Sequence, residues 1–169
     1  MCAAREAVIA AEVARDVAPG KWGITFSLVD DKIGMLRCGT PLVDIIDKFD
    51  GAEFIGINCM DGRRITDQIK YLKSIIPAGM RIAAYGNIGF WVPPAEYQPG
   101  IKQDNDAQHD AIYAEYVMEW LEAGATIVGG CCGTSPSTIR LIADKIWKAI
   151  RYILSLASNL SYYFQTLIK

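Results

Sequence analysis

The sequence predicts an α/β fold in which parallel strands alternate with helices. Four short apolar, β-branched segments are separated by longer segments whose apolar residues recur at helical spacing. The strand segments start roughly thirty to forty-five residues apart, which is typical of β/α units. They are nearly continuous apolar runs, as expected for parallel strands that are covered on both faces. This order favours an α/β protein over a sandwich or a helical bundle.

The expected elements follow from local signals. A helix at residues 3 to 17 is rich in strong helix formers and ends at Pro19 and Gly20. Strands are expected at residues 22 to 29, 53 to 58, 81 to 85 and 125 to 128. Helices are expected after each strand, with Thr40 and Pro41 starting the first of them and Ser135 and Pro136 starting the last.

Each later helix has an apolar face that we expect to point inward. The four expected faces are Leu42, Ile45, Ile46 and Phe49; Ile65, Ile69, Leu72 and Ile76; Ile112, Tyr116, Trp120 and Leu121; and Ile139, Ile142, Ile146 and Ile150. Residues 151 to 169 continue the last helical pattern, and we expect them to form an amphipathic helix that covers exposed core. A coiled coil is the less favoured alternative for this tail.

Charge and hydropathy exclude several classes of protein. The 169 residues include 17 basic and 19 acidic ones, mixed along the chain, so no basic stripe suggests nucleic acid as a partner. The sequence has no run of eighteen apolar residues, and its charged, helical start is unlike a signal peptide. We therefore expect a cytoplasmic protein without a membrane partner.

Three of the five cysteines follow expected strands. Cys59 ends the second strand, and the adjacent Cys131 and Cys132 follow the fourth. The carboxyl ends of parallel strands lie at one edge of the sheet, so these thiols are expected to converge. Three thiolates suit Zn²⁺ and leave its fourth position open. Cys2 and Cys38 do not end strands, and we expect them to be small core residues.

An open zinc position has a direct chemical use. A substrate thiol that binds there loses its proton and becomes a strong nucleophile at neutral pH. The same loop also permits another interpretation, because the glycine-rich segment from Gly129 to Ser135 leads into a helix N-terminus and can cradle a phosphate. Spacing alone does not separate the two.

Several motifs resemble the homocysteine S-methyltransferase family in their order. They are GINC at residues 56 to 59, YGNIG at 85 to 89 and GGCCGTSPSTI at 129 to 139, with TFSL at 25 to 28 similar to the family's fifth strand. The resemblance implies the C-terminal half of a (β/α)₈ TIM barrel, about four β/α units, in residues 1 to 150. Residues 151 to 169 do not resemble the family and are expected to be a divergent helical tail.

The resemblance also implies the site and its chemistry. It implies that Cys59, Cys131 and Cys132 bind zinc, which activates homocysteine for methylation to methionine by a small-molecule donor, with sulfonium donors favoured. Candidate substrate-binding residues are Ser27, Asn58, Tyr85, Asn87, Gly130, Gly133 and Thr134. The family usually has Tyr-Pro-Asn where this chain has Tyr85, Gly86 and Asn87, a change that loosens the backbone.

Strands one to four of the family have no counterpart in this sequence. A half barrel has two unpaired strand edges and uncovered apolar surface, so we expect self-association or a complementary chain. The alternative functions are a catalytically silent zinc-binding fragment or subunit, and a phosphate-binding α/β enzyme.

Other polar residues have simpler interpretations. His109, the only histidine, is expected to be a solvated side chain at a helix start. Asp110 is expected to interact with the dipole of the same helix. The proline-rich loop from Phe90 to Gln103 is either a lid over the methyl donor or packed surface.

Overall fold

The computed structural model describes residues 1–88 and 106–167. The expected lid at residues 90–103 therefore lies outside the described residues. The elements in chain order are α1 (Ala4–Val17), β1 (Gly23–Phe26), η1 (Leu42–Asp44), η2 (Ile46–Phe49), β2 (Phe54–Asp61), α2 (Gly62–Ile75), β3 (Arg81–Asn87), α3 (Asp106–Ala123), β4 (Ile127–Gly130) and α4 (Pro136–Leu167).

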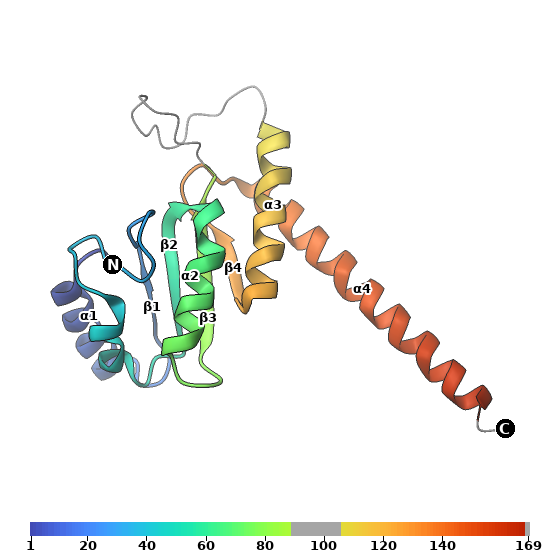
Figure 1. Cartoon of the computed structure of the whole chain (residues 1–169), viewed down its shortest axis with the longest axis horizontal. Coiled ribbons are helices and arrows are strands. Elements are labelled where there is room, and N and C mark those ends of the chain that lie inside the picture. The colour runs from blue at the N-terminus through green and yellow to red at the C-terminus, as the bar shows by residue number, and fades with distance from the viewer. Residues whose placement is uncertain (89–105, 168–169) are drawn as a thin grey trace.

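The four strands form one parallel sheet in the order β1-β2-β3-β4. Helices α2 and α3 pack beside each other over the sheet, and α1 lies at the β1 end (Figure 1). The prediction of parallel β/α units is thus confirmed. Because all strands run in the same direction, their carboxyl ends share one edge of the sheet, where the loops to α2 and α4 begin.

Strand residues alternate between the two faces of the sheet. Ile55 and Ile57 are buried within the main apolar core, together with the inward residues of α2. The alternate positions form rows across the opposite face. One row contains Thr25, Gly56, Ala83 and Ile127, and the next contains Asn58, Tyr85 and Gly129. Apart from Ile127, the side chains of these two rows are therefore small or polar.

The helix expected from Thr40 is replaced by two short 3₁₀ segments, η1 and η2. Ile45, which separates them, has φ −128° and ψ 4°, outside the α region. Leu42 and Phe49 are nevertheless fully buried, and the Phe49 ring lies 5.1 Å from that of Phe26. The apolar spacing identified Leu42 and Phe49 correctly as buried, whereas Ile45 and Ile46 are partly buried against the core.

The buried stripe of α3 differs from the expected one. Its fully buried large side chains are Tyr113, Val117 and Trp120, whereas Ile112 and Tyr116 are only partly buried. The expected face at Ile112 and Tyr116 is therefore wrong by one residue. The Tyr113 hydroxyl shares its single hydrogen between the carbonyl oxygens of Gly86 and Gly129, each at 2.9 Å. These buried hydrogen bonds compensate for placing a tyrosine, rather than an isoleucine, against the sheet.

Gly86 allows Trp120 to lie directly against β3. A Cβ atom at residue 86 would lie 2.7 Å from the Trp120 ring and 2.9 Å from the Ile65 side chain. The departure from the family's Tyr-Pro-Asn motif therefore accompanies tight packing at this position. The glycine supplies space that the core fills, and the expectation that it loosens the backbone stays a prediction.

Helix α4 also departs from expectation. Ile142 is buried, but Ile139 and Ile150 are 45% and 38% exposed. Residues 151–156 are exposed as well, so this part of the tail does not cover the core. No glycine or proline interrupts the sequence after Pro136, and α4 continues straight away from the sheet (Figure 1). Among the helices of the described residues, none has the length and apolar character of a membrane crossing.

Asp110 connects α3 to the start of α4. Its carboxylate accepts hydrogen bonds from Ser137 Oγ at 2.9 Å and Thr138 Oγ1 at 2.5 Å. Asp110 and Thr138 are both buried, and Thr138 is fully so. Besides its expected interaction with the dipole of α3, Asp110 therefore joins α3 to α4. The positions of acidic residues in the sequence do not reveal this contact.

We expect Asp110→Ala to lower the free energy of unfolding by about 1–3 kcal/mol, because the Thr138 hydroxyl would remain buried without its acceptor. Asp110→Asn retains one acceptor oxygen and should have a smaller effect. Urea unfolding followed by circular dichroism measures both changes. Asp67→Ala is the control, since Asp67 is 71% exposed in its pair with Lys70 and should leave stability close to wild type. Equal stability of Asp110→Ala and the control would contradict the assigned role.

Candidate metal centre

Three cysteine sulfurs converge at the carboxyl edge of the sheet. Cys59 lies in β2, while Cys131 and Cys132 follow β4, with β3 between the two strands. Cys132 Sγ is 3.8 Å from Cys59 Sγ and 3.9 Å from Cys131 Sγ. All three sulfurs lie within 4.8 Å of one another and are half-buried. The expected convergence of residues far apart in sequence is therefore present.

The spacing of the sulfurs fits tetrahedral zinc. Zn–S bonds of about 2.3 Å in a tetrahedron place neighbouring sulfurs about 3.8 Å apart. Two of the separations, 3.8 and 3.9 Å, match this edge length. Three soft thiolate donors are also the ligand type that zinc accepts readily. The donor set and its geometry thus suit a zinc ion with three protein ligands.

The backbone of Cys59 has an unusual conformation. Its φ is 56°, the left-handed region, and no other non-glycine residue in the described part of the chain has a positive φ. Pairing between β2 and β3 also shifts there, from Asn58 with Tyr85 to Asp61 with Asn87. A non-glycine residue held in this region costs about 1–3 kcal/mol, so surrounding contacts must maintain it. The irregularity aims a strand residue at the edge of the sheet.

The turn after β4 presents both neighbouring cysteines. Gly133, with φ 78°, provides the left-handed position that the turn requires. Gly130 lies so close to Thr134 that a Cβ atom would come within 2.3 Å of Thr134 Oγ1. Thr134 Oγ1 donates to the Cys131 carbonyl at 2.8 Å and closes the turn. Gly130, Gly133 and Thr134 therefore shape the loop that carries the sulfurs.

The backbone amides of this loop are largely engaged with protein acceptors. Cys131 N donates to Gly86 O at 2.8 Å, and Thr134 N to Cys131 O at 3.3 Å. Cys132 N donates to Asn87 Oδ1 at 3.1 Å, and Ser135 N to Thr138 Oγ1 at 3.0 Å. A phosphate cradle needs free amides that point at the anion. The arrangement thus gives little support to the phosphate-binding alternative.

Asn87 lies beside the sulfur cluster. Its Nδ2 is 4.0 Å from Cys59 Sγ, and its Oδ1 accepts from the Cys132 amide. Ile88 N donates to the Cys132 carbonyl at 3.0 Å, which fixes the end of β3 to the same loop. One amide side chain thus contacts both halves of the cluster. It can donate a hydrogen bond to a thiolate and orient the loop at the same time.

The other candidate residues occupy different positions. Ser27 Oγ donates to the carbonyl of Cys59 at 3.2 Å, so it contacts the backbone of the cluster. Asn58 Oδ1 is buried and has no hydrogen-bond partner among the described residues. Tyr85 is half-buried, and its ring packs against Gly129. Their roles in substrate binding stay predictions.

Burial alters the ionisation of groups at the site. Burial, reinforced by the sulfurs of Cys59 and Cys132, raises the pKa of the Cys131 thiol to about 11. Burial, reinforced by the neighbouring Cys131, also raises the pKa of the Tyr113 hydroxyl, which therefore stays a hydrogen-bond donor at neutral pH. A nearby cation would reverse this effect for the thiols by favouring their charged form.

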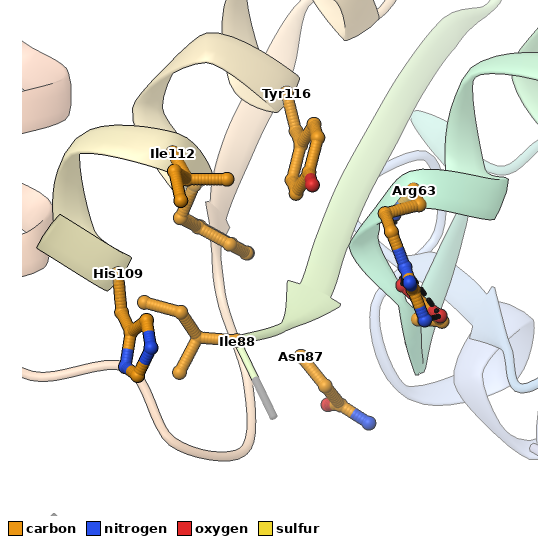
Figure 2. Close-up of a pocket in the computed structure, with 8 residues that line it drawn as sticks. Arg63, Asn87, Ile88, His109, Ile112 and Tyr116 are labelled. Atoms are coloured by element: carbon orange, nitrogen blue, oxygen red, sulfur yellow. Dashed lines mark hydrogen bonds and ion pairs between the residues drawn. The ribbon is translucent and has the colours of Figure 1, made fainter. Parts of the chain in front are cut away.

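A pocket adjoins the cluster at Asn87. Figure 2 shows His109, Ile112 and Tyr116 projecting from α3, opposite Arg63 at the start of α2. Asn87 and Ile88 lie between them at the end of β3. Arg63 is held by Asp61, whose carboxylate it contacts with Nε at 2.9 Å. His109 is half-buried at this pocket, which corrects the expectation of a fully solvated side chain.

Cys2 and Cys38 are both exposed, which corrects the expectation that they are core residues. They lie together at the start of α1, where Cys38 N donates to Cys2 O at 3.3 Å. Cys38 Sγ accepts from Ala4 N and contacts Thr40 Oγ1, both at 3.4 Å. The Thr40 hydroxyl and the Ala4 amide lower the pKa of the Cys38 thiol. The prediction was wrong because neither cysteine belongs to a periodic apolar pattern, and such a pattern is the sequence signal that identifies core positions.

The fold and the cluster define a parallel α/β protein with three thiols at the carboxyl edge of its sheet. A family model described as homocysteine S-methyltransferase matches residues 1–146. The chain belongs to this homocysteine S-methyltransferase family. Selenocysteine methyltransferase from Astragalus bisulcatus is 36% identical over 107 residues, which is 62% of this chain and 28% of that protein.

Homocysteine S-methyltransferase from Escherichia coli is 29% identical over 120 residues, 68% of this chain and 36% of that protein. The metallated form of the E. coli homocysteine methyltransferase MmuM has a similar fold, with a TM-score of 0.63 at 22% identity. That similarity covers 86% of this chain and 42% of the solved chain. The sheet and its helices thus correspond to part of a TIM barrel, and the chain spans less than half the length of these relatives.

Thiol ionisation gives a direct test of the site. In metal-free protein at neutral pH, iodoacetamide should modify Cys38 at least about tenfold faster than Cys131, since only the thiolate reacts. The rate at Cys131 should rise about tenfold per pH unit with the thiolate fraction and level off near its pKa of about 11. Peptide mapping by mass spectrometry measures each rate. Faster labelling of Cys131 than of Cys38 near neutrality would contradict the assigned burial.

Proposed function

We propose that the chain binds one zinc ion through Cys59, Cys131 and Cys132 and takes part in the methylation of homocysteine to methionine. The observation that carries this proposal is the approach of three sulfurs to within 4.8 Å at the open edge of a parallel sheet. Membership of the family supports the substrate and the reaction class. The metallated form of the E. coli relative supports a metal in a related fold.

Cys59, Cys131 and Cys132 would hold the zinc ion. Zinc bound by them would lower the pKa of the homocysteine thiol and so would supply a strong nucleophile at neutral pH. Methyl transfer then forms a new bond between this sulfur and the methyl carbon. The bond from that carbon to the donor sulfur breaks, and the donor keeps the electron pair. A sulfonium donor becomes a neutral thioether and needs no added acid, which favours this donor class.

The chain's own residues have distinct parts in this proposal. Asn87 Nδ2 points toward Cys59 Sγ and can stabilise charge on the sulfurs. Asn58 Oδ1, a buried acceptor without a partner among the described residues, is suited to the ammonium group of an amino acid. Tyr85 lies in the same row as Asn58 and bounds the same face of the sheet. Gly130, Gly133 and Thr134 hold the loop in shape.

The second candidate function is a zinc-binding subunit that acts only with a complementary chain or a second copy. Several large apolar side chains support it because they lie on exposed faces of α4, including Trp147, Ile153 and Leu154 at 60%, 63% and 60% exposure. Exposed apolar surface of this kind favours association. We propose residues 1–150 as the partial barrel domain and residues 151–169 as a helical tail.

Zinc content tests the metal site. Purified chain should contain about one zinc per protein, and Cys131→Ala should lose most of it, because two sulfurs hold zinc weakly compared with three. Inductively coupled plasma mass spectrometry after gel filtration measures the ratio. Cys2→Ala is the matched control, since Cys2 is exposed and outside the cluster. Zinc-free wild type that takes up no added zinc would refute the proposal.

Activity is tested separately from binding. Incubation with homocysteine and either S-methylmethionine or S-adenosylmethionine should produce methionine, detected by mass spectrometry, and Cys132→Ser should reduce the rate by about 100-fold or more because thiol activation is lost. Folded, zinc-loaded chain that produces no methionine would favour the subunit that needs a partner. Phosphate binding without zinc would instead favour the phosphate alternative.

A further inference from the structure

The conformation of Cys59 is maintained by contacts from outside its own strand. Regular pairing with β3 stops at Asn58 and resumes at Asp61, so the sheet ladder does not hold Cys59. Its carbonyl instead accepts a hydrogen bond from Ser27 Oγ at 3.2 Å. Ser27 follows β1 and is only 5% exposed. A buried hydroxyl thus takes the place of a missing backbone partner.

Arg37 determines how this hydroxyl is used. Arg37 Nε donates to Ser27 Oγ at 2.9 Å. A guanidinium can only donate, so Ser27 Oγ must accept from it, and the hydroxyl hydrogen remains available for the Cys59 carbonyl. Ser27 is itself held in place, because its amide donates to the carbonyl of Met1 at 2.9 Å. The order of donation runs from Arg37 through Ser27 to Cys59.

We propose that Ser27 and Arg37 are positioning residues that hold Cys59 in its left-handed conformation and thereby set the affinity of the metal centre. This inference rests on the proposed zinc site. It assigns Ser27 to the support of a metal ligand, in place of the substrate contact expected from the sequence. It also assigns a role to Arg37, which no motif in the sequence indicated.

The physical reason is preorganisation. The left-handed backbone of Cys59 places its sulfur 3.8 Å from Cys132 Sγ. An ordinary strand conformation would point this sulfur in another direction. A site whose third ligand must first be moved into place binds its metal more weakly. The other neighbour of Arg37 is Asp30, at 3.9 Å, and both side chains are about half exposed. That pair is weak by comparison with the contact to Ser27.

Metal affinity of folded protein tests the inference. Zn²⁺ is titrated against a chromophoric chelator with wild type, Ser27→Ala, Ser27→Thr, Arg37→Met and Arg37→Lys. Ser27→Ala should weaken zinc binding by about 10-fold to 100-fold, as is typical when the support of a metal ligand is lost. Ser27→Thr retains the hydroxyl and should restore most of the affinity. Arg37→Met should weaken binding less than Ser27→Ala, and Arg37→Lys should recover part of the loss.

The matched control is Ser74→Ala. Ser74 is an exposed serine of α2 whose hydroxyl also donates to a backbone carbonyl, that of Tyr71, away from the cluster. Urea unfolding of each metal-free variant measures stability independently of the metal. Co²⁺ bound to each variant reports the thiolate ligands through its charge-transfer absorption, which a purely structural role of Ser27 would leave unchanged once the protein is folded.

The outcomes separate this inference from the proposed function. Wild type that binds zinc, together with weakened binding in folded Ser27→Ala and recovery in Ser27→Thr, supports the positioning role. Equal affinity in wild type, Ser74→Ala and folded Ser27→Ala overturns it and leaves the zinc site intact. If Ser27→Ala does not fold, unchanged affinity and Co²⁺ spectrum in Arg37→Met overturn it. Wild type without zinc affinity refutes the proposed function itself.

Discussion

Hydrogen bonding of β3 to both of its neighbours is the constraint on which the site depends. It sets β2 and β4 on either side of one strand, with their carboxyl ends at the same edge. The Sγ atoms of Cys59 and Cys132 thereby lie 3.8 Å apart although the residues are distant in sequence. Asn87, at the end of β3, extends this connection between the strands through its side chain. It accepts a hydrogen bond from the Cys132 amide and lies beside the Cys59 sulfur.

The packing of α3 against the sheet supports the same carboxyl ends of the strands. Trp120 and Tyr113 lie edge to face with ring centroids 5.4 Å apart, beneath the end of β3. Trp120 Nε1 donates to Gly62 O, and Tyr113 donates to carbonyls of β3 and β4. The core therefore fixes the strand ends through directed hydrogen bonds as well as through apolar contact. Such support limits the movement of the three cysteines that are the proposed ligands.

Family membership and local geometry contribute different kinds of support. The family model covers residues 1–146 and places the chain in the homocysteine S-methyltransferase family. The sulfur separations describe this chain's own geometry and support the proposed zinc site independently of the family assignment. The exposed apolar side chains of α4 concern association, and none of them belongs to the cysteine cluster. The proposed metal binding and the proposed association therefore rest on different parts of the molecule.

The sequence by itself determined the alternation of strands and helices, the parallel sheet and the three cysteines at strand ends, because periodicity and strand-end position are local signals. Only the tertiary structure determined the left-handed conformation of Cys59, the order of donation from Arg37 through Ser27, and the burial of Tyr113 and Asp110. Each of these depends on a partner distant in the chain. Local propensity encodes which segments form, whereas hydrogen bonds between segments decide how their side chains are used.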